Sequence, residues 1–405
     1  MVARTLEEMR ASGMDVLVGA SPATLADLAG YRNWIDPLFR EYMMRPGGSS
    51  ATEQALAVLS AEGEVTLLVS AEMAANASGT GADRIVVWGS AEGAPRDLPA
   101  GFEKVAEAFG RPRHATRTEA LLALLDGAGA AARIGAEREA LAAATWEALA
   151  GGGRRAGDCT NLLRLGRMVK SEPQIAMLQR AAEAAEYAAA EALALACVGS
   201  SWRELTDLYR MKLAEHGADL DHFSGSPTGF GLATEAEYRL PERGSMYFDH
   251  GCRLRSWFSD TGHTIAFGPP DDACRQRQAA VRDAVAAGAE QLAPGKPASA
   301  AAEAMRQALD AAGLSGFPHG HGIGLEVRDY PIVVPDTGLR IADDFVSRPA
   351  DLPLEAGMVL NLESAVWAAD VSSVHCERSF VIAGGGCRPL ADQPRDEPLS
   401  ISSGA

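Results

Sequence analysis

Four acidic residues and one histidine in the C-terminal half of the chain stand where the surrounding sequence predicts buried β-strands. Asp249 follows the apolar segment Met246–Phe248, and Asp260 follows Trp257–Ser259 eleven positions later. This spacing fits a hairpin that returns the second carboxylate beside the first. Two buried carboxylates that meet in this way repel each other and lose their hydration, so a cation between them is the natural compensation.

The other three residues extend this pattern. Glu363 ends a second apolar run, Glu377 precedes a third, and His321 lies in the glycine-rich segment His319–Gly324, where small residues let the backbone pass close to a site. Any one of these residues alone is more simply explained as a solvated strand end, a turn cap or a loop residue. Four carboxylates with one imidazole, however, form an oxygen-rich set that suits a pair of Mn, Fe, Co or Zn ions. The sequence therefore predicts a two-metal site and a metal-dependent enzyme.

The composition limits the possible partners. The chain has 405 residues, with 37 Lys and Arg against 54 Asp and Glu, and a formal net charge of −17. This balance argues against nucleic-acid binding, which needs a basic surface, and against docking on anionic membranes. The six cysteines are scattered without a Cys-x-x-Cys pair, and no stretch approaches about 18 uninterrupted apolar residues. We therefore expect a soluble cytoplasmic protein with neither a signal peptide nor a membrane anchor.

The order of secondary-structure signals predicts two domains. In residues 1–158, strands alternate with helices, which is typical of an α/β domain. Its last helix is expected over Glu137–Leu149, and the glycine-rich segment Gly151–Asp158 is the best candidate for a linker. In residues 159–405, two helices followed by antiparallel strands are expected twice, an α+β arrangement. The expected helices are 171–197, 202–216, 274–292 and 298–312, and the expected strands are 245–249, 257–258, 264–267, 359–362, 373–376 and 379–382.

Several segments resemble, in order and spacing, the metal-binding motifs of the creatinase, prolidase and aminopeptidase P family, the pita-bread metallohydrolases. These segments are Asp249–Gly251, Ser259–Thr264, Gly320–Leu325, Gly357–Glu363 and Cys376–Ile382. The resemblance implies a creatinase-type α/β domain (1–158), a pita-bread catalytic domain of two pseudo-symmetric halves (159–405), two divalent metal ions and a homodimer. By position, it also implies one ion held by Asp260, His321, Glu363 and Glu377, and another held by Asp249, Asp260 and Glu377.

The sequence departs from the peptidases of this family at two histidines near the substrate. One would precede the first aspartate, but the corresponding segment Gly229–Tyr238 contains no histidine and places Leu232 nearest the expected position. A displaced imidazole could come from His222, His263 or His319, although a structural role is the simpler expectation for each. The last of these is the strongest candidate because it lies two residues from the predicted metal ligand.

The second missing histidine would follow His321 by seven residues, where this chain has Arg328. A guanidinium is permanently charged, so it cannot donate a proton in catalysis, but it can hold a substrate carboxylate through two hydrogen bonds. The simpler alternative is a surface salt bridge. Either way, the metal site alone does not make the chain a proline peptidase.

The leading hypothesis is a hydrolase that cleaves an amide-type C–N bond in a small, carboxylate-bearing substrate, as Xaa-Pro peptidases do. Glu363 would accept the proton of the attacking water, Arg328 would hold the substrate, and His319 is a further catalytic candidate. One alternative is a metal-dependent lyase similar to dimethylsulfoniopropionate lyase, in which Asp329 or Tyr330 would remove a proton from carbon. Two others are a hydrolase of a small zwitterion, similar to ectoine hydrolase, and a binding homologue that has lost catalysis.

Overall fold

A computed structural model provides the structure of the protein and describes residues 2–32, 54–89, 98–227, 237–368, 372–392 and 398–401. The chain forms two compact units. The first contains residues 1–167 and 341–348, and the second contains residues 168–340 and 349–405. Helix α8 (Thr160–Gly166) packs with α1 (Val2–Ala11) in the first unit, so this unit extends past residue 158, where the sequence pattern places the domain boundary.

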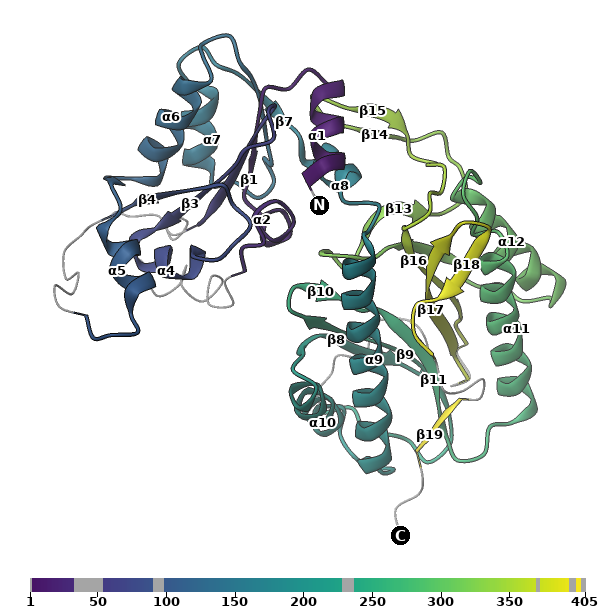
Figure 1. The fold of residues 1–405 in the computed structure, drawn as a ribbon. Helices are drawn as coiled ribbons and strands as arrows, with labels where there is room; N and C mark the ends of the chain where they lie inside the picture. Colours follow the sequence, from purple (N-terminus) through teal and green to yellow (C-terminus); the bar gives the residue numbers. More distant parts are fainter. Residues whose placement is uncertain are drawn as a thin grey trace. The chain divides into compact units, whose positions relative to one another are not determined.

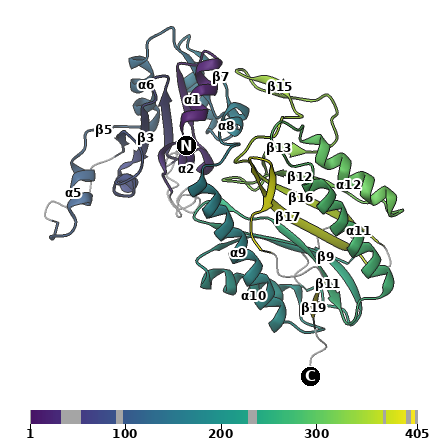
Figure 2. The same cartoon turned by 45° about the vertical axis from the view of Figure 1, so that its right-hand side comes forward.

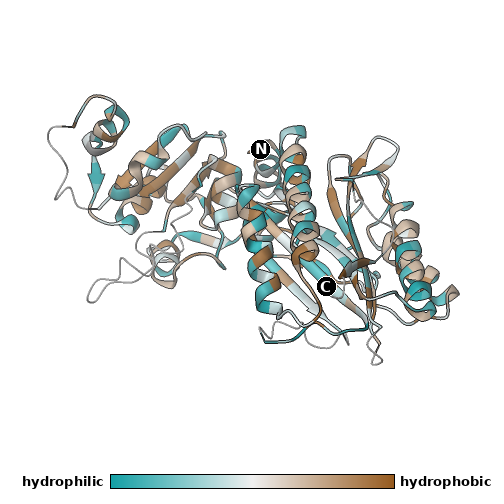
Figure 3. Ribbon diagram, turned by 90° about the horizontal axis from the view of Figure 1, so that it is seen from below, coloured by the Kyte–Doolittle hydropathy of each residue, from teal (hydrophilic) through white to brown (hydrophobic). Residues whose placement is uncertain are grey.

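The first unit is a mixed sheet with helices along its strands (Figure 1). Its strand order is β5-β4-β3-β2-β1-β6-β7, in which only β2 pairs antiparallel with its neighbours. Apolar residues run along these strands (Figure 3). This arrangement confirms the predicted α/β domain. The strands are β1 (Val16–Gly19), β2 (Leu56–Ser60), β3 (Val65–Ser70), β4 (Arg84–Trp88), β5 (Arg113–His114), β6 (Arg133–Ala136) and β7 (Arg155–Asp158). The remaining helices are α2 (Pro22–Ala29), the 3-10 helix η2 (Ala71–Met73), α4 (Ala74–Ala77), α5 (Glu103–Gly110), α6 (Arg117–Gly127) and α7 (Ala143–Ala150).

Two sequence predictions for this unit are wrong. The helix expected over Glu137–Leu149 begins only at Ala143, because the carboxylate of Glu137 is used at the start of α2. It accepts hydrogen bonds of 2.8 Å from the backbone N–H groups of Ala20 and Ser21 and one of 2.8 Å from the Thr24 hydroxyl. The expected linker Gly151–Asp158 is only partly a turn, since β7 pairs in parallel with β6.

The second unit contains two helix pairs on one large sheet (Figure 2). Helix α9 packs with α10 and with β9, whereas α11 packs with α12 and covers β16 and β17. The helices are α9 (Glu172–Leu195), α10 (Trp202–Glu215), α11 (Asp272–Ala289) and α12 (Ser299–Ala311). The strands are β8 (Asp219–Ser226), β9 (Gly244–Leu254), β10 (Trp257–Phe258), β11 (Thr261–Phe267), β12 (His319–Gly322), β13 (Asp329–Val333), β16 (Val359–Val366), β17 (Val374–Ala383), β18 (Gly386–Pro389) and β19 (Leu399–Ile401). The strands β14 (Arg340–Ala342) and β15 (Ser347–Pro349) form a separate two-stranded sheet, and residues 341–348 within it belong to the first unit.

The sheet of the second unit runs β10-β9-β11-β17-β16-β12-β13, and the neighbours in this order pair antiparallel. Ser171 caps the N-terminus of α9 and forms a capping box with the Gln174 side chain, which agrees with a helix expected from residue 171. The two strands expected at 373–376 and 379–382 are one continuous strand, β17. Glu377 lies within this continuous strand, which is in the interior of the sheet between β11 and β16. Within the described part of the chain, no helix has the length and hydropathy to cross a membrane.

Replacing Glu137 with Ala should lower the free energy of unfolding of the first unit by about 2–4 kcal/mol, because it leaves buried N–H groups without an acceptor. The matched control is Glu139→Ala, which removes only an exposed ion pair with Arg164 and should cost less than about 0.5 kcal/mol. Urea denaturation followed by circular dichroism measures both changes. Equal midpoints for the two variants would contradict the role assigned to Glu137.

Candidate active site

The register of the second sheet brings the predicted ligands into one row. Asp249 on β9 pairs with Gly262 on β11, which pairs with Glu377 on β17. Glu377 in turn pairs with Glu363 on β16, and Glu363 pairs with His319 on β12. Side chains of directly paired residues lie on the same face of a sheet. Three carboxylates and an imidazole are therefore held side by side by backbone hydrogen bonds of five strands.

Gly262 at the centre of this row keeps space open for its neighbours. A Cβ atom at this position would overlap the ring of His375 and lie 2.7 Å from Oε2 of Glu377. The absence of a side chain thus lets the polar groups of adjacent strands meet above the β11 backbone.

Asp260 and His321 complete the predicted set. Nε2 of His321 lies 3.4 Å from Oδ2 of Asp260, and Nδ1 lies 3.0 Å from the carbonyl oxygen of Gly322. When Nδ1 donates to this carbonyl, Nε2 is the nitrogen that can bind a metal. The ligand atoms of Asp260, His321 and Glu377 lie within 4.8 Å of one another. The structure therefore brings all five predicted ligands together.

Two further histidines join this group. Nε2 of His222, on β8, lies 2.9 Å from Oδ1 of Asp249 and 3.2 Å from Oδ1 of Asp260. Nε2 of His375, on β17, lies 3.5 Å from Glu363 and 3.8 Å from Glu377. The sequence pattern favours a structural role for His222 and gives His375 no role. The structure thus places two more histidines beside the predicted metal ligands than the metal-binding motifs of the sequence predict.

Two buried polar residues orient the carboxylates. The side-chain amide of Asn361 donates hydrogen bonds of 2.8 Å to Oε1 of Glu377 and 2.9 Å to the carbonyl oxygen of Asp260. The hydroxyl of Tyr247 donates a 3.1 Å hydrogen bond to Asp249, and its ring stacks on His375 with centroids 4.1 Å apart.

These three supporting residues share a signal that the sequence does contain. Each stands two positions before a predicted ligand: Tyr247 before Asp249, Asn361 before Glu363, and His375 before Glu377. Residues two apart on a strand project from the same face, so strand periodicity predicts that they line the same site.

Charges within the site shift the protonation of Asp260 and its partners. Burial opposes ionisation of Asp260, but its interactions with the rings of His222 and His321 outweigh it and lower its pKa to about 2. The histidines change in the opposite sense. Burial disfavours the charge on His222, yet hydrogen bonds to Asp221, Asp249 and Asp260 raise its pKa to about 12. The carboxylate of Asp260 is thus stabilised as an anion by its histidine partners.

The two glutamates of the row differ from each other. Burial raises the pKa of Glu377 well above its usual value, and the charges of Asp260, Glu363 and Asp249 raise it further. Burial also opposes the charge on Glu363, but contacts with His319 and His375 hold its pKa below the usual range. One glutamate thus favours its protonated form while the other favours the anion, as expected where acids crowd together.

This donor set fits divalent metal ions. It contains four carboxylates and a histidine whose buried Nε2 makes no hydrogen bond within the described ranges. Buried acids at such short separations need positive charge between them, and protons on nearby imidazoles supply it only in part. Oxygen-rich ligands with one or a few nitrogens suit Mn, Fe, Co or Zn.

The predicted catalytic residues fall into two groups. Nε2 of His319 contacts Oε1 of Glu363 directly, and Nη2 of Arg328 lies 3.6 Å from the same oxygen, with a side chain that is 61% exposed. In contrast, the carboxylate of Asp329 is buried and lies 3.3 Å from the ammonium of Lys170. Leu232 and most of the segment around it lie outside the described residues.

Comparisons with known sequences agree with this geometry. The model of metallopeptidase family M24 matches residues 176–383. The chain is 28% identical over 241 residues to the uncharacterized peptidase YqhT of Bacillus subtilis. The aligned region covers 57% of this chain and 64% of that protein. It is 24% identical over 244 residues to an Xaa-Pro dipeptidase of Pyrococcus horikoshii, which covers 58% of this chain and 66% of that protein. These matches span slightly less than two thirds of the curated relatives.

Solved structures are similar to nearly the whole chain. An Xaa-Pro dipeptidase from Bacillus anthracis has a TM-score of 0.75 at 17% identity and covers 99% of this chain and 100% of its own. A prolidase from Pyrococcus furiosus has a TM-score of 0.70 at 18% identity, with 96% and 100% covered. The predicted fold, an α/β domain followed by a pita-bread domain, is confirmed. Because the family model matches more than half of its residues, the chain belongs to metallopeptidase family M24.

Proposed function

We propose that this protein hydrolyses an amide-type C–N bond in a small substrate with a free carboxylate, of the Xaa-Pro dipeptide type. The main support for the proposal is the row of acids formed by Asp249, Glu377 and Glu363 on neighbouring strands. A histidine lies near each end of this row, and the exposed guanidinium of Arg328 lies beside Glu363. The names of an Xaa-Pro dipeptidase and a prolidase among the similar proteins agree with this substrate class.

The proposed ligands are those that the sequence pattern predicts. Asp260, His321, Glu363 and Glu377 would hold one divalent ion, and Asp249, Asp260 and Glu377 would hold the other. When bound, such ions polarise a carbonyl group and make a water molecule acidic enough to serve as a nucleophile at neutral pH. The chain's own residues must then bind and orient the substrate and move protons.

Glu363 is suited to accept the proton of the attacking water. Its pKa is held low by its histidine contacts, so it is ionised at neutral pH. The contact between its Oε1 and Nε2 of His319 provides the next position for that proton, from which an imidazole can deliver it to the leaving amine. At the other end of the row, both ring nitrogens of His222 are already paired with carboxylates, Nδ1 with Asp221 and Nε2 with Asp249 and Asp260, so His222 orients these acids. His319 would thus take the place of one of the two missing peptidase histidines.

The surroundings of Glu363 fit a substrate that is apolar at one side and anionic at the other. The Phe317 ring, which is 54% exposed, lies 4.4 Å from the His319 ring and 6.0 Å from the Trp367 ring, measured between centroids. These aromatic faces can contact a proline ring or an apolar side chain. Arg328 can bind the substrate carboxylate through two hydrogen bonds.

The lyase alternative has less support in this geometry. It needs a base that can reach a C–H group of the substrate, and Asp329 is one of the two predicted candidates for that base. Its carboxylate is buried and paired with Lys170, which holds it in an ion pair rather than facing a substrate. The binding-homologue alternative is also weaker, because a protein that had lost catalysis would have no need for all five ligands.

Replacing Glu363 with Gln should lower kcat for an Xaa-Pro dipeptide by about 10²- to 10⁴-fold, since the amide cannot accept the proton. The overall fold should persist, as judged by circular dichroism. The matched control is Glu303→Gln on the exposed face of α12, which should keep full activity. Substantial turnover by a Mn²⁺-loaded Glu363→Gln variant would remove Glu363 from this role.

Replacing Arg328 with Ala should raise KM for a dipeptide by about 10- to 100-fold, because a charge-assisted pair with the carboxylate is lost. The same variant should scarcely change KM for the C-terminally amidated dipeptide. Arg306→Ala, another partly exposed arginine of this unit, serves as the control. If the variant and the parent protein discriminate equally between the free and amidated substrates, Arg328 does not bind the carboxylate.

A further inference from the structure

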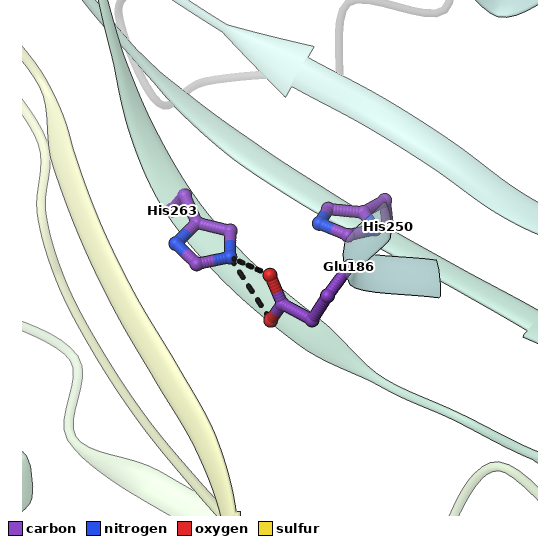
Figure 4. Close-up of side chains that lie close together, drawn as sticks. All are labelled: Glu186, His250 and His263. Atoms are coloured by element: carbon purple, nitrogen blue, oxygen red, sulfur yellow. Dashed lines mark hydrogen bonds and ion pairs between the residues drawn. The ribbon is translucent and has the colours of Figure 1, made fainter. Parts of the chain in front are cut away.

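A second polar cluster lies on the opposite face of the same sheet. It consists of Glu186 from α9, His250 from β9 and His263 from β11 (Figure 4). His250 follows Asp249 and His263 follows Gly262, and successive side chains on a strand project from opposite faces. This cluster is therefore buried between the sheet and α9, apart from the row of acids.

The cluster holds its groups at short distances. Nε2 of His263 lies 3.1 Å and 2.9 Å from the two carboxylate oxygens of Glu186, and the rings of His250 and His263 are 5.7 Å apart between centroids. The hydroxyl of Thr261 donates a 2.8 Å hydrogen bond to the same carboxylate. One ligand atom from each of the three residues lies within 4.8 Å of the other two.

The ion pair between His263 and Glu186 does not explain the environment of the His250 ring. Its Nδ1 lies 3.2 Å from the Tyr209 hydroxyl, whereas its Nε2 is fully buried and has no hydrogen-bond partner in the part of the chain that the structure describes. A buried nitrogen without a partner is costly and uncommon in folded proteins. Figure 4 shows a ring nitrogen of His250 on the side that faces Glu186.

We propose that Glu186, His250 and His263 form a third metal site, suited to Zn²⁺ or a similar transition-metal ion. Two imidazole nitrogens and one carboxylate are a donor set that zinc binds, with a fourth position left for water or another ligand. A cavity of about 330 Å³, lined by Glu186, Asp260 and Thr261 among others, adjoins the Glu186 side of the cluster. Small side-chain shifts would bring the three donors to the zinc–ligand distance of about 2.0–2.2 Å.

The third site stands apart from the proposed reaction. Its ligands are not part of the row, so the inference holds or fails independently of the proposed hydrolysis. Binding there would tie α9 to β9, which carries Asp249, and to β11, which begins directly after Asp260.

The test is a metal count on the full chain. Protein stripped with a chelator is reloaded with Zn²⁺, separated from free ion by gel filtration and measured by elemental mass spectrometry. The variants His263→Gln and His250→Phe should each hold about one ion per chain fewer than the parent protein, because each removes one of three ligands. The control His216→Gln, an exposed histidine, should match the parent. Co²⁺ loading should give visible d–d absorption that His263→Gln lowers.

The difference in Zn²⁺ content between the parent protein and the His263→Gln variant tests the proposal, regardless of how many ions the row of acids binds. If Glu363→Gln loses ions from the row, it should still keep the ion that His263→Gln removes. Should His250→Phe fail to fold by circular dichroism, His263→Gln alone decides, since its side chain is partly exposed. Equal Zn²⁺ content in the parent and in folded His263→Gln would overturn the proposal and leave the cluster as a buried ion pair.

Discussion

Repulsion between carboxylates that are buried side by side is the constraint on which the second unit depends. Backbone pairing fixes Asp249, Glu377 and Glu363 on neighbouring or next-neighbouring strands, so these groups cannot move apart without breaking the sheet. Positive charge must therefore come to them. Imidazoles at His222 and His375, whose pKa values are raised by the neighbouring carboxylates, supply part of it, and divalent ions are proposed to supply the rest.

Other features of the sheet follow from the same constraint. Gly262 leaves out the side chain that would occupy the space between the acids, and Asn361 holds Glu377 and the backbone of Asp260 in one orientation. The pKa of Glu377 is raised and the pKa of Glu363 is lowered, so one of these neighbouring carboxyl groups favours its protonated form and the other its anion. Such a site is poised for metal ions that replace protons, because metal ligands must be deprotonated to bind.

The sequence predicts the fold class and the gathering of four acids and one imidazole, because charged residues inside apolar strands are rare and their order matches a known family. It predicts the surrounding residues poorly. His222 comes from a strand distant in sequence, so only the tertiary pairing of β8 with β9 brings it to Asp249. His375 and Asn361 were within reach of strand periodicity, but a polar residue in a strand has many simpler explanations.

The errors in secondary structure have a similar origin. The sequence after β6 has high helix propensity, yet Glu137 is held by the start of α2, more than a hundred residues earlier in the chain. The glycine-rich segment before β7 looks like a linker because a strand at the edge of a sheet needs few apolar residues. In both places a long-range contact overrides the local pattern.

The central claim is that the row of acids holds two metal ions, and anomalous diffraction tests it most directly. Crystals grown with Mn²⁺ and measured at the manganese absorption edge should show two peaks. One peak should lie among Asp260, His321, Glu363 and Glu377, and the other among Asp249, Asp260 and Glu377. Ordered side chains in this row with no anomalous peak between them would contradict the account.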